Sequence, residues 1–425
     1  MNVIKRDGRI VLFDKEKIKT AVIKAFIDVD GEETSYAKDK ARDIANYIEA
    51  YNEGITDSGD GHGKLSVEDI QDIVEEKLMA SNRKDVARSY IIYRNDRSRI
   101  REKNSNLMKD ISEKLRASNV QNQNANVDEK SFGGRVGEAS DAVLKKYALD
   151  NCMSEMAKNN HLNNEIYVHD LNSYAVGMHN CLSIPFDKLL ANGFNTRQTD
   201  VRAAQSVSTA FQLVAVIFQL QSLQQFGGVS ATHLDWTMIP YVRKSFYKHF
   251  KDGVIYIEGL DLEDFDNGYI HDGLSIIDEI YQSLCYRKAY KYAMDKTEKE
   301  VYQAVEGLYH NLNTLQSRSG NQLPFTSINY GTCTKPEGRM ITKALLEVSI
   351  NGIGKLHKTS IFPCGIFQMM KGVNREPNDP NYDLYKLALR STAQRLYPNY
   401  ANVDWSGNAG YDRNDPQTYF STMGK

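Results

Sequence analysis

The chain has 425 residues, which predicts about two or three domains, because single domains usually contain about 100 to 200 residues. Its composition is 41% hydrophobic and 25% charged, which excludes a disordered chain, a collagen and a disulfide scaffold. The formal net charge of -2 predicts no general attraction to nucleic acid or to an anionic membrane, so anionic partners must bind at local clusters of cations. No segment approaches about 18 uncharged apolar residues, and the charged amino terminus differs from a signal peptide. We therefore expect a cytoplasmic protein with no membrane partner.

Residues 1–101 are predicted to form a separate module. Residues 2–13 alternate around Asp7 and Gly8, a dipeptide that favours the tight turn of a β-hairpin. Apolar residues then recur at helical spacing from Ile18 onward and again after Ser66, a residue type that caps the amino termini of helices. The pattern predicts a short hairpin followed by about four helices, with the polar residues 51–64 as a loop.

Residues 102–130 are polar and nearly featureless, which predicts a connector, and residues 131–425 are predicted to form a second domain. In that domain helical patterns at 203–226 and 274–292 alternate with strand-like runs at 325–330 and 361–367. This alternation is typical of a large α/β domain.

Five cysteines lie far apart and form no Cys-x-x-Cys pair, so we expect reduced thiols and no metal site within this chain. Cys181 differs from the others because it follows His179 and Asn180, and polar neighbours favour an accessible thiol over a packing one. A buried, inert thiol is the alternative. Cys364 lies between Pro363 and Gly365 at the end of an apolar run, where a turn could present a reactive cysteine, but we expect it to be structural. No neighbouring residues support a chemical role for the remaining cysteines, Cys152, Cys285 and Cys333.

The first 24 residues carry seven cations. A hairpin that presents Lys5 and Arg6 beside a helix that carries Lys17 could hold a triphosphate through charge-assisted hydrogen bonds. The alternative from charge alone is a solvated basic face.

Four strings in order decide between these alternatives: Lys-Arg-Asp-Gly at 5–8, Phe-Asp-x-x-Lys-Ile at 13–18, Val-Glu-Asp-Ile at 67–70 and Val-Ala-Arg-x-Tyr at 86–90. Together they resemble the ATP-cone, the allosteric ATP/dATP-binding domain of ribonucleotide reductases. The resemblance implies an effector site lined by Lys5, Arg6, Lys17 and Ile18, with Val67 and Gln71 approaching the base.

Further strings occur at 131–135 (Ser-Phe-Gly-Gly-Arg), 167–171, 179–182, 316–320, 324–329, 361–363 and 379–383. Their order resembles the catalytic domain of anaerobic, class III ribonucleoside-triphosphate reductases, so that the two resemblances cover essentially the whole chain. They imply an α/β fold in which a small hairpin-plus-helices ATP-cone precedes a partial ten-stranded α/β barrel of the glycyl-radical type.

The implied activity is anaerobic reduction of ribonucleoside triphosphates to 2′-deoxyribonucleoside triphosphates through thiyl and glycyl radicals, which supplies DNA precursors. The resemblance further implies formate as reductant, ATP and dATP as effectors, a homodimer, and a radical-SAM iron-sulfur activating enzyme as partner. Helices near Gly227 and Gly228 would form the dimer interface, although this glycine pair also fits a simple helix cap.

Replacing the 2′-hydroxyl by hydrogen needs a radical that removes the 3′-hydrogen, a proton donor and two reducing equivalents, and thiols suit all three roles. By resemblance, Cys181 is the active-site cysteine that protonates the leaving hydroxyl and passes on reducing equivalents. Residues suited to the ribose hydroxyls and phosphates are His169, Asn180, Arg318, Ser327 and Asn329. Each could equally cap a loop, and His169 could simply bond to its neighbour Asp170.

In the family, a Met-Gly-Cys-Arg string with the radical cysteine, further barrel strands, a four-cysteine zinc site and a glycyl-radical string follow these motifs. None of them occurs in the sequence, and Lys425 stands where the radical cysteine is expected. We therefore expect this chain alone to be inactive. A split gene, a fragment made for study and a truncated regulatory remnant all remain open.

Three other functions are weighed against the reductase. A nonenzymatic nucleotide-binding regulator would use the ATP-cone alone. A relative of pyruvate formate-lyase should lack an ATP-cone, so the residues from Lys5 to Ile18 disfavour it. DNA binding through the arginines from Arg94 to Arg101 is disfavoured by the nearly neutral net charge.

Overall fold

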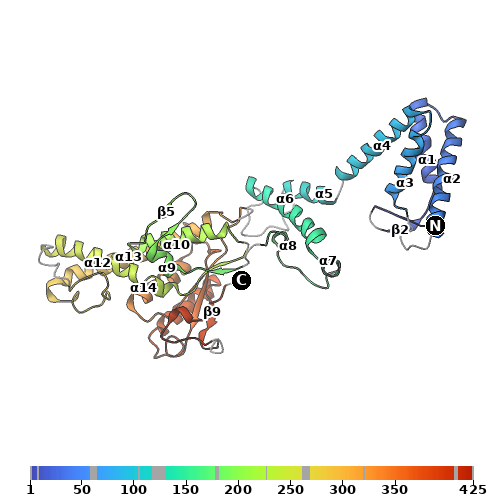
Figure 1. The fold of residues 1–425 in the computed structure, drawn as a ribbon. Helices are drawn as coiled ribbons and strands as arrows, with labels where there is room; N and C mark the ends of the chain where they lie inside the picture. Colours follow the sequence, from blue (N-terminus) through green and yellow to red (C-terminus); the bar gives the residue numbers. More distant parts are fainter. Residues whose placement is uncertain are drawn as a thin grey trace. The chain divides into compact units, whose positions relative to one another are not determined.

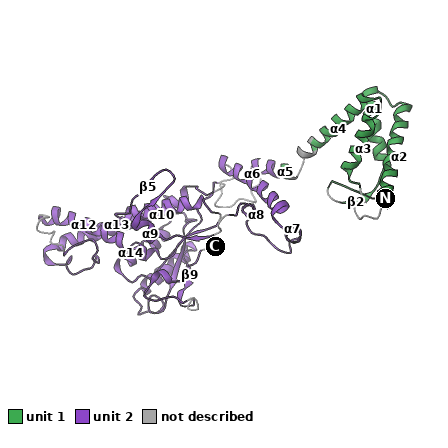
Figure 2. Cartoon of the chain, viewed as in Figure 1, with its two compact units in different colours: residues 1–109 green, residues 110–425 purple. Residues whose placement is uncertain are grey.

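The computed structural model describes residues 2–6, 9–57, 65–103, 106–116, 131–177, 181–225, 227–260, 269–318, 321–405 and 410–423 (Figure 1). The chain divides into two compact units, residues 1–109 and residues 110–425 (Figure 2). In the described part of the chain, no helix has the length and apolar character needed to cross a membrane.

Unit 1 is a hairpin followed by helices. Strand β1 (Asn2–Ile4) pairs antiparallel with β2 (Ile10–Leu12), and the helices are α1 (Lys15–Asp30), α2 (Ser35–Asp57), α3 (Val67–Met79) and α4 (Lys84–Lys103). The predicted hairpin and four helices are thus confirmed, although Asp7 and Gly8 lie outside the described residues. Ser66 caps α3 as predicted, because its side chain accepts from the Asp69 amide while the Asp69 carboxylate accepts from the Ser66 amide.

The predicted loop at 51–64 is wrong for residues 51–57, which continue α2. The buried face of that helix runs from Ile44 and Ile48 to Asn52 at helical spacing, so packing extends into the segment that was predicted as a loop. This packing outweighs the cost of about 1 kcal/mol for Gly54 inside a helix. Residues 58–64 lie outside the described residues.

Unit 2 is built on a parallel sheet with strand order β3-β6-β7-β8-β9. The strands are β3 (Leu182–Ser183), β6 (Val229–Ala231), β7 (Thr326–Tyr330), β8 (Cys364–Met369) and β9 (Asn399–Asn402), with β4 (Phe194–Asn195) and β5 (Asp200–Val201) as a separate antiparallel pair. Parallel strands joined by helices confirm the predicted α/β class.

The helices of unit 2 vary widely in length. They are α5 (Asn106–Arg116), which begins before the division between the units, α6 (Phe132–Tyr147), α7 (Glu155–Leu162), α8 (Leu171–Tyr174), α9 (Phe186–Asn192), α10 (Val207–Ser222), α11 (Leu234–Thr237), α12 (Ile239–Gly253), α13 (Arg287–Thr314), α14 (Pro336–Asn351) and α15 (Tyr382–Arg395). Short π and 3-10 helices are η2 (Ala148–Cys152), η3 (Val254–Glu258), η5 (Leu284–Tyr286) and η7 (Pro416–Thr418).

Local patterns placed some of these elements correctly and others not. The helix predicted at 203–226 is confirmed for residues 207–222, which form α10, and the strand predicted at 325–330 is confirmed as β7. The α-helix predicted at 274–292 is wrong up to residue 286. Residues 274–283 form turns, in which Asp278 accepts from the Ile280 amide at 3.1 Å, and η5 follows them. The strand predicted at 361–367 begins only at Cys364, after Pro363, which cannot donate to the ladder.

The sheet has one polar face. Along β7, Ile328 and Tyr330 point into the main hydrophobic core, so by alternation Ser327 and Asn329 point to the opposite face. Ser230 on β6 is in register with Ser327, and Gln368 on β8 lies two residues beyond Ile366, the partner of Asn329. All four members of this polar face, Ser230, Ser327, Asn329 and Gln368, are buried.

A charged cluster joins three helices of unit 2 and predicts a pH dependence of stability. Glu300 on α13 accepts from His249 at 2.8 Å, from Ser208 at 2.9 Å and from Ser245 at 3.1 Å. Burial raises the pKa of Glu300, but these hydrogen bonds outweigh burial and lower it from 4.5 to about 2. The charged form therefore adds stability above pH 4.5, and this contribution is lost as the pH falls toward 2.

We expect Glu300→Gln to lower the free energy of unfolding by up to about 3 kcal/mol near pH 6 and by progressively less below pH 4.5. Urea unfolding followed by tryptophan fluorescence measures unit 2, because Trp236 and Trp405 are the two tryptophans of the chain. A difference between variant and wild type that stays constant from pH 6 to pH 3 would contradict this account.

Candidate active site and nucleotide cavity

A cavity of about 190 Å³ in unit 1 collects residues that lie far apart in the sequence. Five of the six predicted effector residues line it, namely Lys5 from the hairpin, Lys17 and Ile18 from α1, and Val67 and Gln71 from α3. The hairpin is fixed against the start of α3 because the Ile4 amide donates to the Leu65 carbonyl at 3.0 Å. Burial raises the pKa of Tyr90, another lining residue, to about 12, so its hydroxyl stays protonated at neutral pH.

The sixth predicted residue, Arg6, bonds to α3 instead of lining the cavity. Its guanidinium donates to Gln71 Oε1 at 2.9 Å and forms an ion pair with Glu68. Arg6 and then Arg94 lower the pKa of the Glu68 carboxyl by hydrogen bonding. Arg6 therefore contacts a residue of the cavity wall, Gln71, from outside.

The cavity combines an apolar wall with exposed cations. Lys5 is exposed, and the Lys17 side chain is 80% exposed, with its ammonium 3.2 Å from Asp14. The volume is below the range of about 300–1,000 Å³ that is usual for small-molecule sites, so a nucleoside triphosphate would extend past it. This arrangement suits a ligand with a flat apolar body and an anionic end.

Arg94, the first residue of the arginine run considered for DNA binding, lies within unit 1. Its guanidinium contacts Glu68 at 2.8 Å, Asp72 at 2.7 Å and Glu75 at 2.9 Å. Burial alone lowers the pKa of Arg94, but the three carboxylates outweigh burial and raise it. These contacts tie α4 to α3.

In unit 2, Cys181 immediately precedes β3 and is half-buried. Arg318 interacts electrostatically with the Cys181 sulfur and with the carboxylates of Asp170 and Asp141. Burial lowers the pKa of Arg318, and these three groups oppose that effect. The Arg318 guanidinium donates to Gln322 at 2.8 Å and lies 5.9 Å from the Phe325 ring. The structure thus brings together the predicted thiol and the predicted phosphate ligand.

One further string from the sequence, at 131–135, contacts Asn321, three residues after this arginine. Asn321 donates to the Ser131 hydroxyl at 3.0 Å, where α6 begins. A Cβ atom at Gly133 would lie 2.2 Å from Asn321 Oδ1, so a larger residue here would force the Asn321 side chain to move. The string at 131–135 therefore packs against Asn321.

The remaining predicted substrate residues have different surroundings. His169 is exposed and its Nδ1 contacts the Asp170 carboxylate, while Asn180 lies outside the described residues. Asn329 is fully buried, and its amide nitrogen donates to Ser230 at 3.1 Å and to the Thr422 carbonyl at 3.0 Å. Its oxygen accepts from the Thr422 amide at 3.1 Å. Ser327 is fully buried on the same face.

The other cysteines differ from Cys181 in burial. Cys333 and Cys364 are buried, and burial raises the pKa of both thiols. Cys364 Sγ lies 3.5 Å from the Tyr397 hydroxyl. Cys152 and Cys285 are exposed. Among the described residues, no group of three or more His, Cys, Asp or Glu side chains is arranged to hold a metal ion.

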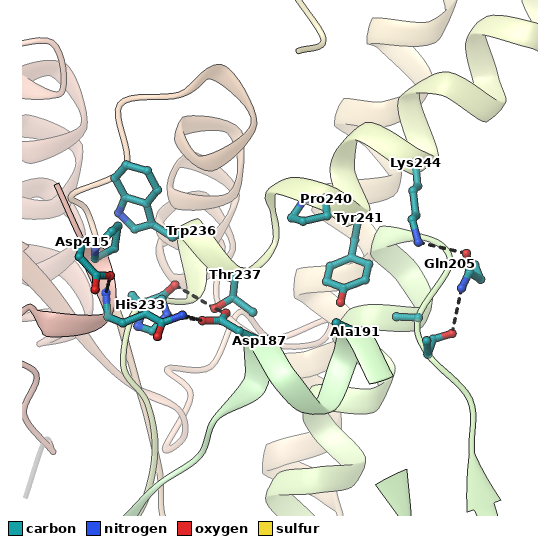
Figure 3. Close-up of a pocket in the computed structure, with 14 residues that line it drawn as sticks. Asp187, Ala191, Gln205, His233, Trp236, Thr237, Pro240, Tyr241, Lys244 and Asp415 are labelled. Atoms are coloured by element: carbon teal, nitrogen blue, oxygen red, sulfur yellow. Dashed lines mark hydrogen bonds and ion pairs between the residues drawn. The ribbon is translucent and has the colours of Figure 1, made fainter. Parts of the chain in front are cut away.

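A second cavity, of about 400 Å³, lies near the carboxyl ends of β3 and β6. Figure 3 shows Asp187 and His233 among the residues that line it. Asp187 follows β3 and His233 follows β6, and the two side chains bond at 2.7 Å. Burial raises the pKa of Asp187, but hydrogen bonds from His233 and Thr237 outweigh burial and hold it below the ordinary value. This cavity was not predicted from the sequence, although the carboxyl ends of parallel strands are a usual place for ligands.

Comparison with known proteins shows a matching family for each of the two units. The family model "Anaerobic ribonucleoside-triphosphate reductase" matches residues 123–424, and the "ATP cone domain" model matches residues 1–99. The chain belongs to the anaerobic ribonucleoside-triphosphate reductase family. The predicted family and the ATP-cone are thereby confirmed.

Relatives within this reductase family match nearly all of this chain but only about half of their own length. The anaerobic ribonucleoside-triphosphate reductase of Haemophilus influenzae is 32% identical over 406 residues, which are 95% of this chain and 52% of that protein. The Escherichia coli enzyme is 30% identical over 95% of this chain and 51% of its own length. The chain therefore spans about half the length of the curated relatives that it matches. A crystal structure of the Thermotoga maritima anaerobic ribonucleotide reductase matches 70% of this chain and 49% of its own, with 16% identity and a TM-score of 0.45.

Proposed function

We propose that this chain supplies the nucleotide-sensing module and the Cys181 part of the active site of an anaerobic ribonucleoside-triphosphate reductase, which produces 2′-deoxyribonucleoside triphosphates for DNA synthesis. The observation that carries the proposal is that Arg318 lies within electrostatic range of Cys181, the residue that immediately precedes β3. An arginine near a thiol can hold the triphosphate of a substrate whose ribose faces the sulfur. Membership in the reductase family supports the same chemistry.

In the proposed reaction, the Cys181 thiol donates its proton to the 2′-hydroxyl, which leaves as water. Formate is the proposed reductant, and its oxidation to carbon dioxide releases the two electrons that replace the carbon-oxygen bond by a carbon-hydrogen bond. A glycyl radical, made by a radical-SAM iron-sulfur activating enzyme on a glycine outside this sequence, would supply the radical that starts the reaction. Arg318 would orient the phosphates, and the exposed His169 would contact the substrate from solvent.

ATP and dATP are the proposed effectors of the cavity in unit 1. Lys5, Lys17 and, after exchange of its partners, Arg6 would bind the phosphates. Ile18 and Val67 would pack against the base, and the Gln71 amide would bond to its edge. We also propose a homodimer in the cytoplasm, as the family resemblance implies.

Protection of Cys181 from alkylation tests the proposal on the chain as it exists. We expect CTP to slow iodoacetamide labelling of Cys181 at least about threefold at a concentration above its dissociation constant, because bound ligand covers the thiol. The exposed Cys152 and Cys285 are internal controls whose labelling should not change. Binding of dATP without any protection of Cys181 by CTP would favour a nonenzymatic nucleotide-binding regulator.

A further inference from the structure

The polar face of the sheet is covered by residues 420–423, which we call the covering segment. Gln368 on β8 donates to the Phe420 carbonyl at 2.8 Å, and Asn329 on β7 bonds to both backbone groups of Thr422. Both amide side chains are fully buried, and a buried amide without partners costs about 1–3 kcal/mol. The covering segment supplies hydrogen-bond partners to both amides, so these contacts stabilise both the sheet and the segment.

The covering segment runs across the sheet in a definite direction. Phe420 lies at β8, Thr422 lies at β7, and a Cβ atom at Gly228, just before β6, would be 3.6 Å from Met423 Sδ. The strand order places β3 next to β6 on the side away from β7. The segment therefore crosses β8, β7 and β6 in turn and heads for β3, which Cys181 immediately precedes.

Strand register places the Cys181 side chain on the same face. Leu182 is in register with Val229, and the Leu182 amide donates to the Gly228 carbonyl at 3.0 Å, so Cys181 lies beside Gly228. Registered neighbours point to the same side of a sheet, and Gly228 shares its face with Ser230. Met423 and Phe325 both lie on that side of Gly228, and Arg318 lies over the ring of Phe325.

The residues that precede the covering segment are also held in place. Gln417, in η7, donates to Asp187 Oδ2 at 3.2 Å, at the cavity near the carboxyl end of β3. Tyr419 packs in a small core with Met370 and Val403. The region from Gln417 to Met423 is thus held both at the carboxyl end of the strands and on the polar face.

We propose that Asn329 and Gln368 are positioning residues, which hold the covering segment so that Met423 lies next to the Cys181 thiol. Asn329 then acts on the reaction through the segment, by shaping the surroundings of Cys181, and its link to catalysis rests on the proposed function. The placement of Met423 beside Cys181 does not depend on that function.

Disulfide trapping in the full chain tests the placement directly. We expect Met423→Cys to form a disulfide with Cys181 under mild oxidation by diamide, detected by peptide mass spectrometry. The exposed Cys152 and Cys285 compete for the introduced thiol and serve as internal controls. Coupling of the introduced thiol to Cys181 that is no faster than its coupling to either control cysteine would overturn the proposal.

Variants at the two amides test the positioning role. In the Met423→Cys background, Gln368→Leu and Asn329→Asp should each slow trapping about tenfold, since each removes a donor to the segment. Asn381→Asp is the matched control, because Asn381 is a buried amide that bonds to the Gly331 and Cys333 carbonyls and should leave the rate unchanged.

Amide hydrogen exchange tests whether misfolding of the variants explains slower disulfide trapping. We expect both variants to lose protection in a peptide that covers residues 420–423 while protection in α13 is kept. Unchanged trapping and unchanged exchange in both variants would refute the positioning role. Neither measurement needs reductase activity or CTP, so their failure would leave the proposed function to be judged by alkylation protection alone.

Discussion

Replacement of Cys181 by serine is expected to lower anaerobic CTP reduction by at least about 100-fold, because general acid catalysis alone usually contributes about 10²–10⁴-fold. Serine keeps the size of the side chain but is a far weaker acid and cannot carry reducing equivalents. The assay combines this chain with a carboxy-terminal fragment of a relative, the activating enzyme and formate, and it measures dCTP.

Two controls separate chemistry from folding in this experiment. Cys285→Ser changes an exposed cysteine and should leave dCTP formation within about twofold of wild type, as surface substitutions usually do. Binding of dATP to the Cys181→Ser chain should be unchanged, because the effector cavity belongs to unit 1. A Cys181→Ser chain that retains most of its activity would exclude this thiol from the reaction.

The second large effect is expected at the effector cavity. The double variant Lys5→Met, Lys17→Met should weaken dATP binding by about 10- to 100-fold, because a hydrogen bond to a charged group contributes about 1.5–3 kcal/mol. Methionine keeps much of the length of lysine, so the packing of the hairpin on α1 is disturbed little. Isothermal titration calorimetry on the full chain measures the change.

A matched control is Lys38→Met, because Lys38 is an exposed cation on α2 whose nearest acidic partner, Glu33, is 3.7 Å away. This variant should bind dATP with the wild-type affinity. Wild-type binding also should weaken as salt is raised, and the double variant should show a smaller dependence on salt. Equal affinities for the double variant and Lys38→Met would place the phosphates elsewhere.

Much of unit 1 could be predicted from sequence because its signals are local. The Ser66 cap, the helical spacing from Ile18 and the hairpin pattern each act within a few residues of themselves. The strings of the ATP-cone then identified the cavity residues from Lys5 to Gln71, although they did not show that Arg6 bonds to Glu68 and Gln71. That partner choice depends on how α3 packs on the hairpin.

Unit 2 was harder to predict because its decisive contacts join distant residues. Strand β3 has two residues, which is too short to show an alternating pattern, so Asp187 and His233 could not be recognised as neighbours. Gly227 and Gly228 fitted a helix cap, yet α10 ends at Ser222 and Gly228 instead permits the close approach of Phe325.

Asn329 shows that the type of a residue does not determine which group it bonds to. Its amide is suited to hydrogen bonding, and from the sequence we predict a substrate as its partner. In the structure both amide atoms of Asn329 bond to Thr422, which lies 93 residues further along the chain. No local pattern carries information on such a contact.

Formation of dCTP from CTP by wild-type chain, under anaerobic conditions with the completing fragment, activating enzyme and formate, tests the central claim most directly. We predict formate-dependent dCTP formation that disappears with Cys181→Ser. Binding of dATP together with no dCTP from any combination of the components, in an assay where a full-length relative is active, would contradict the claim.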